Sequence, residues 1–95
     1  MSSNDIIERI KYRDYHRVAE EMHYEAHVGK SRNHKQGQIA SVETIERTLK
    51  STHLKLRYLR ELGKTATEVA EETYEQTREA MGLDKFDEEI WAGGE

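Results

Sequence analysis

The residues best suited to chemistry form one short run between two long helical patterns, His27 to Gly37, with the sequence HVGKSRNHKQG. The run holds three cations, Lys30, Arg32 and Lys35, and no acidic side chain. The whole chain has a formal net charge of −4, so this cationic run belongs to an acidic protein. Lysine and arginine attract phosphate, and arginine can bind it through two parallel hydrogen bonds. The run predicts an anion-binding turn; a solvated connector is the alternative interpretation.

A nucleotide site also needs an aromatic surface, because stacking of a base on a ring contributes about 1–3 kcal/mol per base. The first helical pattern carries Tyr12 and Tyr15 ahead of the cationic run. Tyr15 also lies on the apolar face of that pattern, so a packing role is the competing interpretation. The ligand-binding residues that we predict are Tyr12, Tyr15, Lys30, Ser31, Arg32, Asn33 and His34.

A second pattern on the first helix has the residue types of a metal site. His16, Glu20, His23 and His27 follow one another at spacings of four, three and four, which places them in a narrow arc of one helix face. Glu-x-x-His is the pair used by ferritin-like di-iron bundles, and imidazole and carboxylate groups also bind zinc. The motif occurs once, so a symmetry-related copy would have to complete the site. We keep metal binding as an alternative and predict no cofactor.

The motifs of nucleotide hydrolysis and of nucleophilic catalysis are not matched. Gly29-Lys30-Ser31 agrees with the end of a P-loop, but Tyr24 occupies the position of its first glycine. The preceding pattern is also that of a helix, whereas a P-loop follows a strand. No Ser-His-Asp order and no nucleophile elbow is recognisable in the chain. We therefore predict a protein that binds without catalysing a reaction.

Composition indicates a small all-α protein with one domain over residues 1–95. There is no proline, and 35% of the residues are hydrophobic against 36% charged. Such a chain buries little apolar surface alone, so a homo-oligomer is expected. The chain contains no cysteine, no apolar run of membrane-spanning length and no signal peptide in its polar start. These features predict a cytoplasmic location without membrane contact.

The first helical pattern changes its apolar face partway along. Ile6, Ile7 and Ile10 form one patch, and a second patch on a different face follows the polar run of residues 11–14. Either the helix bends at that run, or it contacts different partners along its length. Gly29 is expected to end the pattern. The second patch consists of Tyr15, Val18, Ala19, Met22 and Ala26.

The second helical pattern has two possible starts and two apolar sides. Ser31 could cap it, or it could begin near Gln38 after Gly37, and Gly63 is expected to end it. A helix that is apolar on two sides in a small protein is usually contacted on both, which again favours subunit contacts. The first stripe is Val42, Ile45, Leu49, Thr52, Leu56 and Leu59, and the nearly opposite stripe is Leu54, Tyr58 and Leu62.

A third helix is predicted from Thr65 to Met81, with small side chains on one face and Gly82 as its stop. The second pattern is rich in bases and the third in acids, which favours their antiparallel pairing. The acidic tail that follows is interpreted as a short docking helix, because Phe86, Ile90 and Trp91 have helical spacing. The predicted fold is a long antiparallel helical hairpin with a third helix and a short C-terminal segment, in an oligomer.

A tyrosine on the first helix, followed fifteen residues later by a lysine at the turn, resembles the phage anti-CBASS sponge family. The resemblance covers the first helix and the turn. It implies a hexamer that sequesters cyclic oligonucleotides in the host cytoplasm and so silences a bacterial immune pathway. It also implies base stacking on Tyr15 and phosphate binding by Lys30. The family has a second pocket, for cyclic trinucleotides, which we do not assign to residues of this chain.

A continuous first helix would separate Tyr15 from the turn by about 20 Å. Two such helices, paired antiparallel about a two-fold axis near Met22, would place Tyr15 of one beside Lys30 of the other and form two equivalent pockets. In that arrangement the histidine stripe lines the pocket. We therefore predict sequestration of cyclic dinucleotides in a dimer-based homo-oligomer that does not bind DNA. A ferritin-like metal-binding oligomer and a scaffold protein without a ligand are the alternatives.

Overall fold

The computed structural model describes residues 3–29 and 39–82 of the chain. Four α-helices occur in this part: α1 (Ser3–Lys11), α2 (Tyr15–Gly29), α3 (Val42–Leu56) and α4 (Ala66–Ala80). A short 3₁₀ helix, η2 (Arg57–Arg60), extends the end of α3. No strand is present in the described residues, and the predicted all-α class is confirmed.

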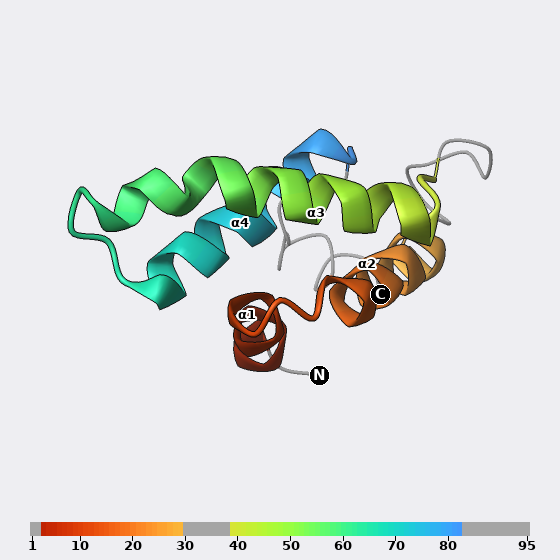
Figure 1. Cartoon of the computed structure of the whole chain (residues 1–95). Helices are drawn as coiled ribbons and strands as arrows, with labels where there is room; N and C mark the ends of the chain where they lie inside the picture. Colours follow the sequence, from red (N-terminus) through yellow and green to blue (C-terminus); the bar gives the residue numbers. More distant parts are fainter. Residues whose placement is uncertain (1–2, 30–38, 83–95) are drawn as a thin grey trace.

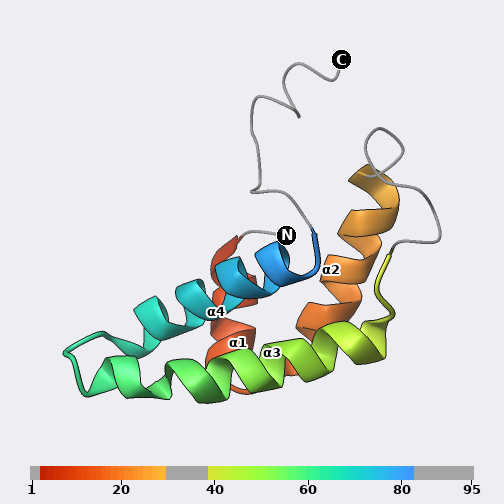
Figure 2. The ribbon, with the colours of Figure 1, turned by 90° about the horizontal axis from the view of Figure 1, so that it is seen from above.

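The helices form two layers that cross each other. Helices α3 and α4 lie side by side and run in opposite directions, as the charge pattern of the sequence favours (Figure 2). Helices α1 and α2 form the other layer, which crosses beneath α3 and α4 in the view of Figure 1. Between the layers, α1 packs on α4 and α2 packs on α3.

The first predicted helix is interrupted at residues 12–14, where the sequence places the change of apolar face. Arg13 adopts a left-handed conformation, with φ of 64°. The Asp14 N–H donates to the Arg9 carbonyl at 2.8 Å, and the Arg13 N–H donates to the Ile10 carbonyl at 2.9 Å. These two bonds are those of a Schellman motif, which usually has glycine at the left-handed position. The chain therefore bends, and a continuous first arm of the predicted long hairpin is not formed.

Side-chain caps fix the starts of the last two helices. The Ser41 hydroxyl accepts a hydrogen bond from the Thr44 N–H at 3.2 Å, and α3 begins at Val42. The predicted starts at Ser31 and Gln38 were therefore wrong, because the capping residue lies later in the chain. Helix α4 begins as predicted, with Thr65 and Glu68 forming a reciprocal capping box.

Glycine ends the α3–η2 segment, as predicted. The Lys64 N–H donates to the Leu59 carbonyl at 3.0 Å, the Gly63 N–H donates to the Arg60 carbonyl at 3.1 Å, and Gly63 has φ of +91°. This is the same Schellman pattern as at Arg13, here with the residue that adopts positive φ without steric cost. The predicted stop at Gly82 also has a positive φ, of +73°.

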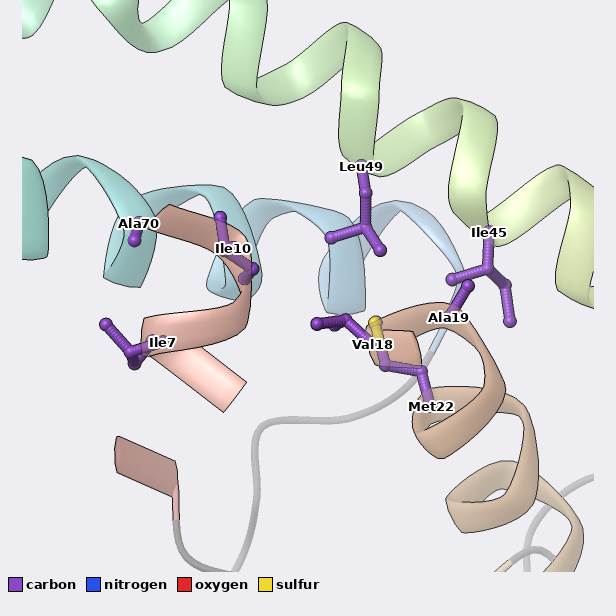
Figure 3. Packing of buried hydrophobic residues seen from close by; sticks show 8 residues of the cluster. All are labelled: Ile7, Ile10, Val18, Ala19, Met22, Ile45, Leu49 and Ala70. Atoms are coloured by element: carbon purple, nitrogen blue, oxygen red, sulfur yellow. The ribbon is translucent and has the colours of Figure 1, made fainter. Parts of the chain in front are cut away.

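The core lies between the two layers (Figure 3). Ile7 and Ile10 of α1 lie on the side of Ala70 in α4, whereas Val18 and Met22 of α2 lie toward α3. The two apolar patches of the first pattern thus pack toward different helices. From the first stripe of α3, Ile45, Leu49 and Leu56 are buried. The opposite stripe, Leu54, Tyr58 and Leu62, is exposed.

Polar contacts join α2 to the helices on either side of it. Arg78 of α4 is only 5% exposed, and its guanidinium donates to the Glu25 carboxylate at 2.7 Å and to the Tyr74 hydroxyl at 3.3 Å. Arg9 of α1 pairs with Glu21 of α2. A buried guanidinium needs such partners because desolvation of an unpaired charge is costly. These pairs therefore help to define how the helices cross.

We predict that Arg13→Gly stabilises the fold. A left-handed conformation costs a non-glycine residue about 1–2 kcal/mol, and after the greater freedom of glycine in the unfolded chain the net gain should be about 0.5–1 kcal/mol. Urea denaturation followed by circular dichroism measures this change. The matched control is Arg47→Gly at an exposed position within α3, which should lose about 1 kcal/mol. Equal losses of stability in both variants would show that Arg13 does not have a strained, left-handed conformation.

Candidate functional site

The cationic run predicted to bind anions falls in the segment that the structure does not describe. Lys30, Ser31, Arg32, Asn33 and His34 all lie outside residues 3–29 and 39–82. The described chain approaches this segment through the end of α2 and leaves it through residues 39–41, which lead into α3. The anion-binding role of the five residues therefore stays a prediction.

Tyr15 is placed for packing and for a hydrogen bond to α3. It is the first residue of α2, is half-buried and packs against the core cluster. Its hydroxyl lies 2.6 Å from Nδ1 of His53, and the two rings meet edge to face with centroids 5.7 Å apart. Tyr12, the second predicted stacking residue, lies in the turn after α1 and is exposed.

Burial shifts the proton equilibria of both partners in this contact. It lowers the pKa of His53, and the nearby charges of Arg13 and Arg57 lower it further. It also raises the pKa of Tyr15, with Arg13, Lys50 and Arg57 acting in the opposite direction. Neutral His53 with its proton on Nε2 accepts the hydrogen bond that the Tyr15 hydroxyl donates. The fold therefore favours the uncharged form of the pair.

The predicted histidine stripe on α2 divides into two groups, of which His16 belongs to the first. Its Nδ1 lies 2.9 Å from a carboxylate oxygen of Glu46 on α3, and its Nε2 lies 3.7 Å from Glu20. Glu46 is also paired with Lys50, at 3.1 Å. The hydrogen bond from His16 lowers the pKa of Glu46, and the same bond raises the pKa of His16. This group is an exposed ionic contact between α2 and α3.

His23 and His27 form the second group, one turn apart near the end of α2. The His23 Nδ1 lies 3.0 Å from the carbonyl oxygen of Ala40, and the Nε2 atoms of the two histidines are 3.1 Å apart. A carbonyl only accepts hydrogen bonds, so His23 carries its proton on Nδ1. Its Nε2 is then the acceptor for the Nε2–H of His27. The backbone before α3 thus orients one imidazole toward the other.

The four residues of the predicted metal set do not converge on one point. The two ring nitrogens of His16 face different carboxylates, whereas His23 and His27 face each other. Within residues 3–29 and 39–82, no group of three or more metal-ligating side chains is present. The Nε2 separation of 3.1 Å is nevertheless close to the roughly 3.3 Å expected between two nitrogens bound tetrahedrally to one zinc ion. The histidine pair can therefore supply two ligands of a metal site.

Three partners in these groups were not predicted from the sequence: His53, Glu46 and the carbonyl of Ala40. His53 and Glu46 each directly follow a member of the predicted buried stripe of α3, Thr52 and Ile45. Polar side chains at the edge of a buried stripe are the ones that can contact a neighbouring helix. The location of His53 and Glu46 beside the stripe was therefore the signal that could have identified them. A backbone carbonyl carries no signal in the residue types.

Comparison of the chain with protein-family models, curated proteins and solved structures found no match. In the part of the chain that the structure describes, none of the helices has both the length and the apolar character that a membrane span requires.

We predict that His53 and His16 give opposite contributions to the pH dependence of stability. The pKa of His53 is lowered, so its contribution is present above its ordinary value of 6.5 and is lost as the pH falls below that value. The pKa of His16 is raised, so its contribution is present below 6.5 and is lost as the pH rises through the raised value.

Urea midpoints measured from about pH 7.5 to about pH 5, the range in which histidine titrates, test this prediction. Relative to the unmodified protein, His53→Asn should lose less stability on acidification, and His16→Asn should lose more. The two variants serve as controls for each other, because each removes one imidazole from the contact between α2 and α3. Identical pH profiles for the three proteins would refute both assignments.

Proposed function

We propose that the chain sequesters cyclic dinucleotides, or larger cyclic oligonucleotides, without turning them over. The supporting observation is the acid-free cationic run at residues 27–37 of a chain with net charge −4. Phosphodiester groups are the anions that paired lysine and arginine side chains bind well. The resemblance to the anti-CBASS sponge family points to the same ligand class. In a host cytoplasm such binding would remove the second messenger and block antiphage immune signalling.

The described end of α2 has surfaces suited to a base next to this run. Tyr24 is 69% exposed, and Val28, one turn later, is also exposed. Tyr24 lies just before the run and Val28 lies within it, ahead of Lys30. An exposed aromatic ring can stack on any base. The C-terminal end of a helix carries the negative end of its dipole, so the phosphates need the cations of the run. This division of roles assigns the base to α2 and the phosphates to Lys30 and Arg32.

A subunit pair would add Tyr15 to the same pocket. Helix α2 has 15 residues and is therefore about 22 Å long, so Tyr15 and the cationic run belong to opposite ends of it. Antiparallel pairing of two α2 helices would bring Tyr15 of one subunit toward Lys30 of the other. Met22, near the middle of α2, is buried in its own core. The pairing would therefore use the exposed face at the same level, which includes Arg17, Glu20 and Tyr24.

Lys30→Ala should weaken binding of a cyclic dinucleotide by about 1.5–3 kcal/mol, the usual contribution of a charge-assisted hydrogen bond. A thermal-shift screen over cyclic di- and trinucleotides first identifies the ligand, since a ligand that binds the folded state raises its apparent stability. Calorimetric titration of the variant with that ligand then measures the loss. Lys55→Ala, at an exposed position on α3, is the matched control and should bind normally. Equal affinities for both variants would remove the cationic run from the site.

Metal binding is the second candidate function, and the Nε2 separation of 3.1 Å between His23 and His27 favours it. The hydrogen bond from His23 to Ala40 is of the kind that orients metal-bound imidazoles. A second subunit could supply the remaining ligands.

Zinc should raise the melting temperature of the untagged protein if the pair binds it. His27→Asn should abolish that shift, whereas His16→Asn, the control on the same helix, should retain it. A zinc shift that persists in His27→Asn, or no shift in the unmodified protein, would exclude this pair as a metal site.

A further inference from the structure

The exposed stripe at the end of α3 is an apolar surface that the described fold leaves uncovered. Leu54, Tyr58 and Leu62 are 64%, 55% and 70% exposed and follow one another through α3, η2 and the turn after it. They belong to the end of the α3–α4 pair that projects beyond α1 and α2 (Figure 2). Single exposed apolar residues are ordinary, but three in succession on a projecting end favour contact with a partner.

Basic side chains border this stripe. Lys55, Arg57 and Arg60 are exposed, and Glu61 is the one acidic residue in the sequence from Leu54 to Leu62. A complementary partner therefore combines apolar anchors with negative charge, because matched charges around an apolar centre favour the correct partner.

The chain itself contains such a segment after α4. Residues 83–95, LDKFDEEIWAGGE, carry Phe86, Ile90 and Trp91 at helical spacing. The segment has five acidic residues, Asp84, Asp87, Glu88, Glu89 and Glu95, against one lysine. We propose that this C-terminal tail docks as a short amphipathic helix on the Leu54–Tyr58–Leu62 stripe of a second copy of the chain.

The second copy follows from the limited reach of a helical tail. The tail begins after Gly82, at the end of the α3–α4 pair opposite to the stripe (Figure 2). Helix α4 has 15 residues, so the two ends of the pair are about 22 Å apart. A helical tail advances about 1.5 Å per residue, so Ile90 extends only about 12 Å from Gly82. The anchors therefore do not reach Tyr58 and Leu62 at the far end of the stripe of their own chain.

Docking between copies gives the exposed stripe of α3 and the small core a common explanation. The tail of one chain covers the projecting end of the other, and each copy both donates a tail and receives one. The stripe lies at the projecting end of the α3–α4 pair, away from α2 (Figure 2), so docking on it can occur whether or not the chain binds a nucleotide. The inference is therefore independent of the proposed function.

Trp91 is the only tryptophan of the chain, and its fluorescence reports docking directly. At micromolar concentration we expect an oligomer by light scattering and a blue-shifted Trp91 emission that moves to the red on dilution. Tyr58→Glu should lower the self-association at least about tenfold, as removal of an aromatic anchor does, and shift the emission to the red. Gln76→Glu also introduces a negative charge, at an exposed position on α4, and should leave the emission unchanged.

Mixing two defective variants separates docking between chains from docking within one chain. Tyr58→Glu keeps the tail but loses the stripe, whereas Trp91→Ser keeps the stripe but loses the tail anchor and has no tryptophan. The emission of the mixture therefore comes from the Tyr58→Glu chain alone, and a blue shift on mixing is expected. No shift, or a blue emission in the unmodified protein that is independent of concentration, would overturn the proposal. Circular dichroism of each variant checks that the helices remain folded.

Discussion

The left-handed turn at Arg13 is the constraint on which the rest of the structure depends. It ends α1 and sends the chain back as α2, so two short helices cross the α3–α4 pair instead of one long helix. Ile10 and Met22 are both buried as a result, although they belong to patches on different faces of the sequence pattern. A straight helix could not turn both patches toward the same pair of helices. The bend thus resolves a conflict that is already present in the residue order.

Polar contacts then select one way of crossing among those that apolar packing allows. Helix α2 is bound to its neighbours by Arg9–Glu21, His16–Glu46 and Glu25–Arg78, and by the hydrogen bond between Tyr15 and His53. Pairs at exposed positions contribute little to stability, because water and salt screen them. The Glu25–Arg78 pair differs, because Arg78 is buried and its charge requires a partner. Apolar area therefore drives association of the helices, while these pairs favour a particular orientation.

The sequence allowed prediction of features that depend on local chemistry. Thr65 was recognised as a helix start, and Gly63 and Gly82 as helix ends, because capping and positive φ have characteristic residue types. The end of α1 has no such signal, since an arginine occupies the position that usually holds glycine. The change of apolar face was the indirect sign of this bend. The start of α3 at Val42 was missed because Ser31 and Gly37 offered competing local signals.

The candidate sites were less predictable, because they depend on partners from other helices. The spacing of His23 and His27 indicated that they share a face, but the carbonyl of Ala40 that orients His23 has no counterpart in residue types. His16 shares the same face, but its imidazole contacts Glu46 of α3 and not the histidine pair. The same applies to Tyr15, whose contact with His53 joins two residues far apart in sequence. Spacing on one helix therefore predicts proximity but does not determine the partners.

The central functional claim is that the protein retains a cyclic dinucleotide without changing it. Equilibrium dialysis against a labelled cyclic dinucleotide, followed by denaturation of the protein and chromatography of the released ligand, tests this claim most directly. If the protein sequesters the ligand, retention is saturable and the intact cyclic molecule is fully recovered after prolonged incubation. A linearised or hydrolysed product would show that the protein is an enzyme. The absence of saturable retention across cyclic di- and trinucleotides would contradict sequestration itself.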